Sequence, residues 1–102
     1  MGYHLGDRVG AISHGADGKV YIFGYGTYQG RETPVDAGGW IGQVLVENEV
    51  PNPKIVLDSG KVVWGCECWW ASEATVLKQV MGREIIILDI DEERKRVGTE
   101  RN

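Results

Sequence analysis

The chain has 102 residues, of which 42% are hydrophobic and 25% charged, and its formal net charge is −4. This length suits one domain with a modest core, and the composition is that of an ordinary globular protein. An acidic chain has no electrostatic reason to bind duplex nucleic acid, whose affinity depends on neutralised phosphates, so no such partner is expected. No apolar run approaches the roughly 20 residues that span a bilayer, so no membrane partner is expected either.

The glycine and cysteine content indicates the structural class of the protein and the redox conditions in which it works. The 15 glycines are about twice the average share, and their scatter through apolar segments favours tight turns and bulges in a small β structure. Cys66 and Cys68 lie two residues apart, which on one strand is poor geometry for a disulfide between them. A reducing, cytoplasmic setting is therefore expected.

The first half of the chain predicts two strands and an irregular segment. Residues 7–12 form a first short strand, and residues 20–28, rich in β-branched and aromatic side chains, form a strong second one. Residues 29–40 contain several glycines and end on Trp40, which makes them the candidate functional loop. A further strand is predicted over residues 41–47.

The second half predicts a hairpin, in which residues 54–57 and 61–70 pair across Asp58-Ser59-Gly60. Ser72 is the expected N-cap of a helix that runs to about Met81 and has Gly82 as its stop. The side chains that this helix is expected to bury are Val76, Leu77, Val80 and Met81.

The end of the chain combines an apolar strand with a polar tail. Residues 84–90 predict a central strand buried on both faces. The tail over residues 91–102 has almost no apolar content and is expected to be disordered, which leaves residues 1–90 as a single domain. The sum is an α+β protein: a small, partly open, mainly antiparallel β-barrel of five to six strands with one helix.

The stretch from Val62 to Trp70 concentrates three tryptophans, both cysteines and one carboxylate. As one strand it would send Trp64, Cys66, Cys68 and Trp70 into the core. Glu67 and Trp69 would then share the other face, where Gly65 leaves room for a ligand. A carboxylate beside an aromatic wall suits proton transfer or ligand binding, and the alternative is an ordinary solvated glutamate.

Four aromatic residues could form a stacking platform or cage for a base or a similar ring. They are Tyr25, Tyr28, Trp40 and Trp69. The alternative is that they fill the core. Tyr25 and Tyr28 lie on opposite faces of a regular strand, so a bulge at Gly24 or Gly26 would be needed to bring both to one site.

The glycine-rich segment Gly24–Gly30 is a weak phosphate-binding candidate. It lacks the P-loop and dinucleotide patterns, and no helix is predicted after it. Backbone amides near Gly26 and the side chain of Arg31 could still meet one phosphate. The alternative is that Arg31 is an ordinary surface residue.

No metal site or cofactor is expected. Structural zinc sites pair cysteines two to four apart across a turn with a second ligand pair elsewhere. Here Cys66 and Cys68 sit in a strand-like run, and the only histidines are His4 and His14. The two cysteines are read as small buried hydrophobes.

The segment Val20–Gly30 resembles the opening of the gamma-glutamylcyclotransferase-like fold, in which an apolar strand runs into Tyr-Gly-Ser/Thr-Leu with a glycine soon after. Tyr25-Gly26-Thr27 and Gly30 match, and Tyr28 replaces the leucine. The resemblance implies an enzyme whose loop amides hold a substrate carboxylate and whose base is a later glutamate. Glu67 is the residue that could take that role here.

The chain as a whole, through Val20–Gly30, Asn52-Pro53-Lys54-Ile55 and Trp64–Trp70, also resembles short uncharacterised proteins of phage and bacterial genomes. Several phage proteins of this size are anti-defence sponges that sequester nucleotide-derived immune signals as oligomers. The resemblance implies a cytoplasmic setting, that of the host cell if the chain is phage-encoded, and it transfers no catalytic residue.

The function predicted from the sequence is non-enzymatic binding of a small, nucleotide-derived molecule by a homo-oligomer. The residues expected to bind it are Tyr25, Gly26, Tyr28, Arg31, Trp40, Glu67 and Trp69. Two alternatives remain: a gamma-glutamylcyclotransferase-like enzyme with Glu67 as general base, and a protein-interaction module with Trp40 and Trp69 as hot spots.

Overall fold

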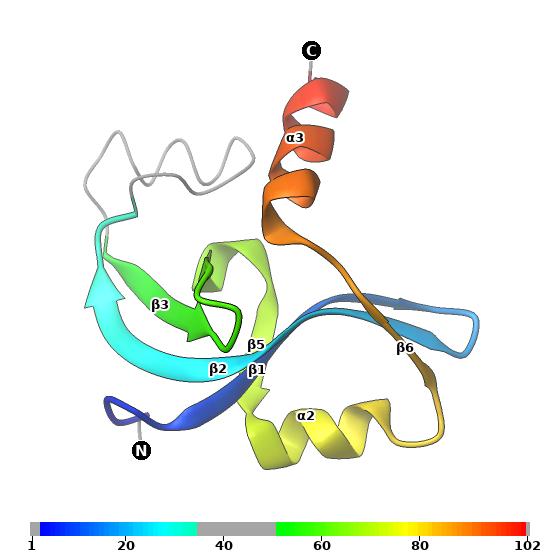
Figure 1. Cartoon of the computed structure of the whole chain (residues 1–102), viewed down its shortest axis with the longest axis horizontal. Coiled ribbons are helices and arrows are strands. Elements are labelled where there is room, and N and C mark those ends of the chain that lie inside the picture. The colour runs from blue at the N-terminus through cyan, green and yellow to red at the C-terminus, as the bar shows by residue number, and fades with distance from the viewer. Residues whose placement is uncertain (1–2, 35–50, 102) are drawn as a thin grey trace.

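The computed structural model describes residues 3–34 and 51–101, and the predicted strand over residues 41–47 lies outside them. In chain order the elements are β1 (Arg8–Ala16), β2 (Lys19–Glu32), β3 (Asn52–Leu57), β4 (Val62–Trp64), the 3₁₀ turn η1 (Gly65–Glu67), β5 (Trp69–Ser72), α2 (Glu73–Val80), β6 (Glu84–Ile87) and α3 (Ile90–Arg101). Figure 1 shows the sheet at the centre, α2 against one side of it and α3 extending away from it.

One mainly antiparallel sheet of six strands organises the fold. Its order is β4-β3-β2-β1-β5, and β6 pairs with β2 in parallel. The predicted α+β class and the antiparallel character are therefore confirmed. Within the described residues the path of the sheet ends at β4 and at β5 without closing, so the barrel stays a prediction.

The long strand β2 connects the two halves of the sheet. Its first residues pair with β6 and its last residues with β3, while β1 runs along most of its length. Ala11 pairs with Gly24 and Ile12 with Ile22, so a bulge lies next to Gly24. At Gly26 the strands approach closely: a Cβ there would lie 2.2 Å from the backbone oxygen of Val56. This position therefore requires glycine.

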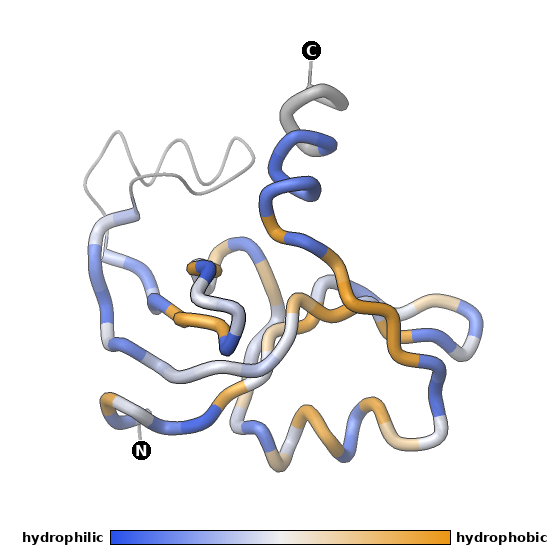
Figure 2. The backbone as a smooth tube through the Cα atoms, viewed as in Figure 1, coloured by the Kyte–Doolittle hydropathy of each residue, from blue (hydrophilic) through white to orange (hydrophobic). Residues whose placement is uncertain are grey.

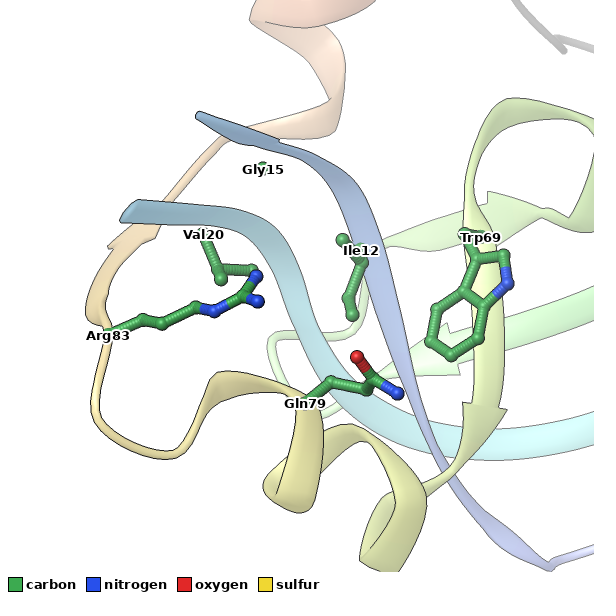
Figure 3. A pocket seen from close by; sticks show the side chains of 6 residues that line it. All are labelled: Ile12, Gly15, Val20, Trp69, Gln79 and Arg83. Atoms are coloured by element: carbon green, nitrogen blue, oxygen red, sulfur yellow. The ribbon is translucent and has the colours of Figure 1, made fainter. Parts of the chain in front are cut away.

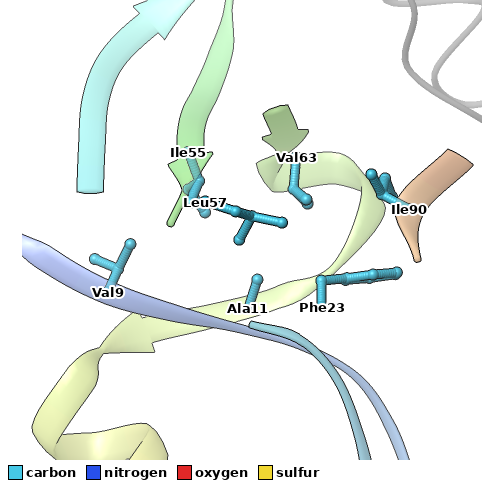
Figure 4. Close-up of a cluster of buried hydrophobic side chains, with 7 residues drawn as sticks. All are labelled: Val9, Ala11, Phe23, Ile55, Leu57, Val63 and Ile90. Carbon is cyan, nitrogen blue, oxygen red and sulfur yellow. The ribbon is translucent and has the colours of Figure 1, made fainter. Parts of the chain in front are cut away.

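The core consists of two clusters of buried side chains. The first, shown in Figure 4, comprises Val9, Ala11, Phe23, Ile55, Leu57, Val63 and Ile90. The second comprises Ile12, Val20, Ile22, Ala71, Val76 and Val80, so α2 supplies its last two members. Burial of these apolar side chains is the main favourable contribution to folding.

Helix α2 forms where the sequence predicted it, and its cap is the predicted one. The Ser72 hydroxyl accepts a hydrogen bond from the Thr75 amide at 3.2 Å. Val76 and Val80 are buried as expected. The expected burial of Leu77 and Met81 is wrong, since they are 50% and 76% exposed. The helix is only eight residues long and packs on β1 and β5, so these two positions have no element above them in the described chain.

Strand β6 departs most from its prediction as a doubly buried central strand. It pairs with β2 alone among the described strands, and Ile85 and Ile87 are 46% and 65% exposed. Figure 2 shows this segment as a hydrophobic stretch that leads from the end of α2 to α3. The apolar run predicts a strand that other elements of the chain cover on both faces. In the structure α2 packs on β1 and β5 and leaves β6 exposed.

The polar segment after β6 is helical in the structure, where the sequence predicted disorder. Helix α3 begins at Ile90, which is 2% exposed and belongs to the first core cluster. Residues 91–96, which follow, are hydrophilic (Figure 2). The helix extends away from the sheet (Figure 1). Neither described helix is long and apolar enough to cross a membrane.

Candidate functional site

The stretch from Val62 to Trp70 is not one strand, and the predicted alternation of its side chains is therefore wrong. The 3₁₀ turn η1 separates β4 from β5. The Cys66 amide donates to the Asn52 side-chain oxygen at 2.8 Å, and Gly65 packs against Pro53, where a Cβ would be 2.9 Å from the proline ring. These contacts from β3 hold the chain in a turn at this point.

Glu67 points into the protein and does not share an open face with Trp69. Its side chain is 5% exposed. One carboxylate oxygen accepts from the Trp64 amide at 3.0 Å, and both accept from Arg94, each at 2.7 Å. The Nη2 nitrogen of Arg94 also donates to the Val62 carbonyl at 3.0 Å. A carboxylate held in this way anchors α3 to η1, and this geometry gives no support to a proton-transfer role.

Tyr25 and Tyr28 lie on opposite sides of the sheet. Tyr25 packs against the cluster beneath α2, and its hydroxyl is buried without a hydrogen-bond partner. Burial and the nearby Glu73 carboxylate raise the pKa of Tyr25. Tyr28 stacks on Trp70, with ring centroids 5.4 Å apart, and Tyr3 packs on the same indole at 4.6 Å. The bulge beside Gly24 does not bring the two tyrosines to one site.

The other predicted phosphate-binding groups are also separated. Gly26 is buried in the strand, close to the backbone of β3, rather than open to a ligand. Arg31 is exposed near the end of β2, opposite Pro53. The Tyr28 amide donates to the Asp7 carbonyl, so that donor is already used. Trp40 lies outside the described residues.

Trp69 is the predicted site residue that borders a cavity. Its side chain is 50% exposed and lines a groove of about 190 Å³ between the sheet and the end of α2. The lining residues are Ile12, Gly15, Val20, Trp69, Gln79 and Arg83. Figure 3 shows Gln79 and Trp69 on opposite sides of the groove and the Arg83 side chain extending toward Val20.

The groove has an apolar floor and a polar rim. Ile12 and Val20 are 9% and 2% exposed, and Trp69 is the direct partner of Ile12 in the β1–β5 pairing. Gly15 adds no side chain to the groove, and a Cβ there would lie in ordinary van der Waals contact, 3.7 Å from the Arg83 guanidinium. The site thus offers an indole, an amide and a guanidinium around a small apolar surface.

Sequence reasoning missed Gln79 and Arg83. Both flank the predicted helix end at Gly82, and Gly82 itself has a positive φ of 77°. A polar residue in the last helical turn and another just after the glycine stop are brought to one side by that turn. The helix end and Gly82 could therefore have indicated that Gln79 and Arg83 lie close together. Their proximity to Trp69 depends on the β1–β5 pairing, which no local pattern indicates.

The two cysteines are free thiols in the structure. Burial raises the pKa of Cys68 to about 12, and it raises the pKa of Cys66 as well, with the Glu67 carboxylate adding to both. Within residues 3–34 and 51–101, no group of three His, Cys, Asp or Glu side chains is placed to hold a metal ion.

Comparisons with protein-family models, with curated proteins and with solved structures find no match to this chain.

Proposed function

We propose that this chain is a non-enzymatic binding protein whose ligand is a small planar anion of the nucleotide type, held in the Trp69 groove. The ring of the ligand stacks on the Trp69 indole, its anionic group meets Arg83, and its polar edge meets the Gln79 amide. The observation that carries this proposal is a half-exposed tryptophan above an apolar floor with a guanidinium at the rim.

The chemistry of the rim favours a planar anion over other small molecules. Stacking of a base on an aromatic side chain contributes about 1–3 kcal/mol per base. Arginine combines a delocalised positive charge with donors that match phosphate or carboxylate oxygens. The groove of about 190 Å³ is smaller than the roughly 300–1,000 Å³ of drug-sized ligand sites. It would therefore hold the ring and one anionic group and leave the rest of the ligand in water.

The predicted role as an immune-signal sponge belongs to the same proposal, with the site moved from the Tyr25–Arg31 segment to Trp69. A sponge binds without turnover, and the ion pair between Glu67 and Arg94 leaves the gamma-glutamylcyclotransferase alternative without an available base. The partly open barrel, the homo-oligomer and the cytoplasmic setting are part of this proposal. Two free thiols are in keeping with a reducing compartment.

A protein-interaction module is the second candidate, and a specific observation favours it. Besides Trp69, four large apolar side chains are exposed on α2, just after it and on β6: Leu77, Met81, Ile85 and Ile87. Large apolar side chains exposed on neighbouring segments of the chain are typical of protein-binding sites. A partner would place an apolar side chain in the groove and an acidic one against Arg83.

The proposal is tested by equilibrium binding of a panel of mononucleotides, dinucleotides and cyclic nucleotides, measured by isothermal titration calorimetry. Trp69→Ala is expected to weaken the best binder by about tenfold or more, and Trp69→Phe to restore most of the affinity. Tyr3→Ala is the matched control, since it removes an exposed aromatic ring that does not line the groove.

Turnover and salt dependence complete this test. The bound nucleotide should be recovered unchanged by chromatography, and Arg83→Gln should weaken binding most at low salt, where the anion contact is least screened. Binding that Trp69→Ala and Arg83→Gln leave unaltered would contradict the site. No binding to any member of the panel, with an effect of Trp69→Ala on a protein partner, would favour the interaction module instead.

A further inference from the structure

We propose that the protein forms a two-fold symmetric dimer in which the free edge of β6 pairs with β6 of a second copy, antiparallel and centred on Ile86. This inference rests on the backbone and charge pattern of β6 rather than on the Trp69 groove, so it stands independently of the proposed ligand. A second copy of this chain is the expected partner because the sequence of β6 is complementary to itself when two copies run antiparallel.

The hydrogen bonds of β6 show which of its groups are available. The amide of Glu84 donates to Gly18 at 3.0 Å and that of Leu88 to Ile22 at 2.8 Å, so the even-numbered residues face β2. In a parallel pair the residues between them direct their amides and carbonyls to the opposite side. The backbone groups of Ile85 and Ile87 therefore point away from β2, along an edge that pairs with no strand of the described chain.

The side chains at this edge are apolar and exposed. Ile85 is paired with Val20, and Ile87 with Ile22, so all four lie on the α2 side of the sheet. Ile85 and Ile87 are nonetheless 46% and 65% exposed. Natural edge strands are usually protected by a charge, a proline or a bulge, and β6 carries none of these at its outward-facing positions. An edge of this kind indicates a strand that is covered in the functional protein.

The sequence around Ile86 is self-complementary in one antiparallel register. With Ile86 on the two-fold axis, Ile85 lies opposite the partner's Ile87, and the reverse pair forms by symmetry. These are hydrogen-bonded positions, because both residues direct their backbone groups outward. Ile86 then faces the partner's Ile86 as a pair without hydrogen bonds. This agrees with the pairing to β2, because the backbone amide and carbonyl of Ile86 already point toward β2.

Charge selects this register over its neighbours. Arg83 and Asp89 flank β6 at equal distances from Ile86, Arg83 in the turn before the strand and Asp89 just after it. The Arg83 amide donates to the Val80 carbonyl at 3.0 Å, so the Arg83 side chain, and not its backbone, would meet the partner's Asp89 at each end of the ladder. A shift that centres the pair on Ile85 would place Arg83 opposite an isoleucine, and a shift to Ile87 would do the same to Asp89. Opposite charges across antiparallel strands stabilise the pair, whereas an isoleucine offers a charge no partner.

The Asp89 carboxylate has capacity for this contact. Its two oxygens accept from the Lys61 ammonium and from the Glu92 amide. An ionised carboxylate presents about four lone-pair sites, so one further donor from the second copy can be added without displacing either contact.

Arg83 can meet the partner and the groove ligand at once. A guanidinium has five donors in a fork. Arg8 of this protein shows such double use, since it donates to both Asp58 oxygens at 2.7 and 2.8 Å and to Glu73 at 2.9 and 3.1 Å.

The interface is isologous, as expected of a two-fold dimer, because each copy contributes the same strand.

Disulfide cross-linking tests the register directly. In the proposed dimer the two Ile86 Cα atoms are about 4.5 Å apart, within the 4.4–6.8 Å range that disulfides span. Ile86→Cys should therefore form a covalent dimer under mild oxidation, detected on a non-reducing gel. Ile85→Cys is the matched control, because each introduced thiol would face position 87 of the partner and lie beyond about 7 Å from its own copy. The wild-type chain controls for Cys66 and Cys68.

Analytical ultracentrifugation tests the interface without cross-linking. The wild-type protein is expected to be a dimer, and Ile87→Lys to raise the dimer dissociation constant by about tenfold or more, because the lysine would disrupt the apolar pairs. Leu5→Lys is the control, since Leu5 is also apolar and 74% exposed, and it lies before β1 and beside Gly30, near the end of β2 that does not pair with β6. Circular dichroism confirms that each variant is folded.

Three results would overturn the proposal. They are a wild-type protein that stays monomeric at all accessible concentrations, a dimer that Ile87→Lys leaves intact, and cross-linking of Ile86→Cys that does not exceed that of Ile85→Cys. A monomer would assign the edge to a strand of another protein, and the last result would place the dimer contact elsewhere.

Discussion

The guanidinium of Arg94 holds both carboxylate oxygens of Glu67, with Nε 2.7 Å from Oε2 and Nη2 2.7 Å from Oε1. The two side chains are only 16% and 5% exposed. Because they come from α3 and from the turn between β4 and β5, the pair fixes the first turns of a polar helix against the domain. Such a forked pair adds geometric specificity as well as attraction.

Arg94→Ala is expected to destabilise the protein by about 3 kcal/mol or more, because it leaves the Glu67 carboxylate buried without its positive partner. Chemical denaturation with circular dichroism detection measures the effect. Arg96→Ala is the control, since the Arg96 side chain is 53% exposed and pairs at 2.9 Å with Glu93, which is 18% exposed. Loss of such a surface pair costs about 0.5 kcal/mol or less. Equal effects of the two variants would contradict the anchoring role of Arg94.

Gly26→Ala is expected to cost about 3 kcal/mol or more, at the upper end for overpacking. The new Cβ would lie 2.2 Å from the Val56 oxygen and 2.6 Å from the Leu57 Cα, and these backbone atoms cannot move without breaking the β2–β3 pairing. Thermal unfolding measures the loss. The control is Gly15→Ala, whose nearest contact would be 3.6 Å and which should stay close to the wild type. A fully stable Gly26→Ala protein would show that β3 does not approach β2 this closely.

The two thiols are expected to differ in reactivity. A pKa of about 12 at Cys68 leaves only about one part in ten thousand as thiolate at pH 8, and the thiolate is the reactive form. Alkylation with iodoacetamide, followed by peptide mass spectrometry, should modify Cys66 first, and the rate at each site should rise with pH. Faster modification of Cys68 in the folded protein would contradict its burial.

Acid is expected to remove the stabilisation that the surface carboxylates provide. Hydrogen bonds from Arg8 lower the pKa of Asp58, and those from Lys61 lower the pKa of Asp89. A carboxylate whose pKa is lowered on folding stabilises the native state above its unfolded pKa of about 3.9, and this contribution is lost as pH falls through the folded value. The Tm difference between the wild type and Asp58→Asn should therefore shrink below that pH. It should also shrink in high salt, because Asp58 is exposed. A Tm difference between the wild type and Asp58→Asn that grows as the pH falls would contradict the stabilising role of the ionised Asp58.

Local patterns predicted the strands and the helix whose partners are close in sequence. The β1–β2 hairpin, the β3–β4 hairpin and the capped helix α2 each carry their own turn or cap residues, such as Gly60 or Ser72. Strand β6 was located correctly, but its exposure depends on where α2 packs, which is a long-range property. The continuous isoleucines indicated burial, and no neighbour within the described chain supplies it.

The candidate site was predicted less well, for one physical reason. Val62–Trp70 has strand-like composition, yet the Asn52 side chain and Pro53 of β3 hold its middle as a turn. That turn buries Glu67 against Arg94 and places Trp69 beside α2. Of the predicted residues that the structure describes, Trp69 alone lines the groove, and the β1–β5 pairing brings it next to Gln79 and Arg83.

Binding of a planar anion in the Trp69 groove can be followed residue by residue with two-dimensional ¹H–¹⁵N NMR during a titration with the nucleotide panel. We expect saturable shifts of the Trp69 indole NH, the Gln79 side-chain amide and the Arg83 amide, with the Tyr28 and Arg31 amides unchanged. Shifts confined to Tyr28 and Arg31, or no shift with any nucleotide, would contradict the proposed site.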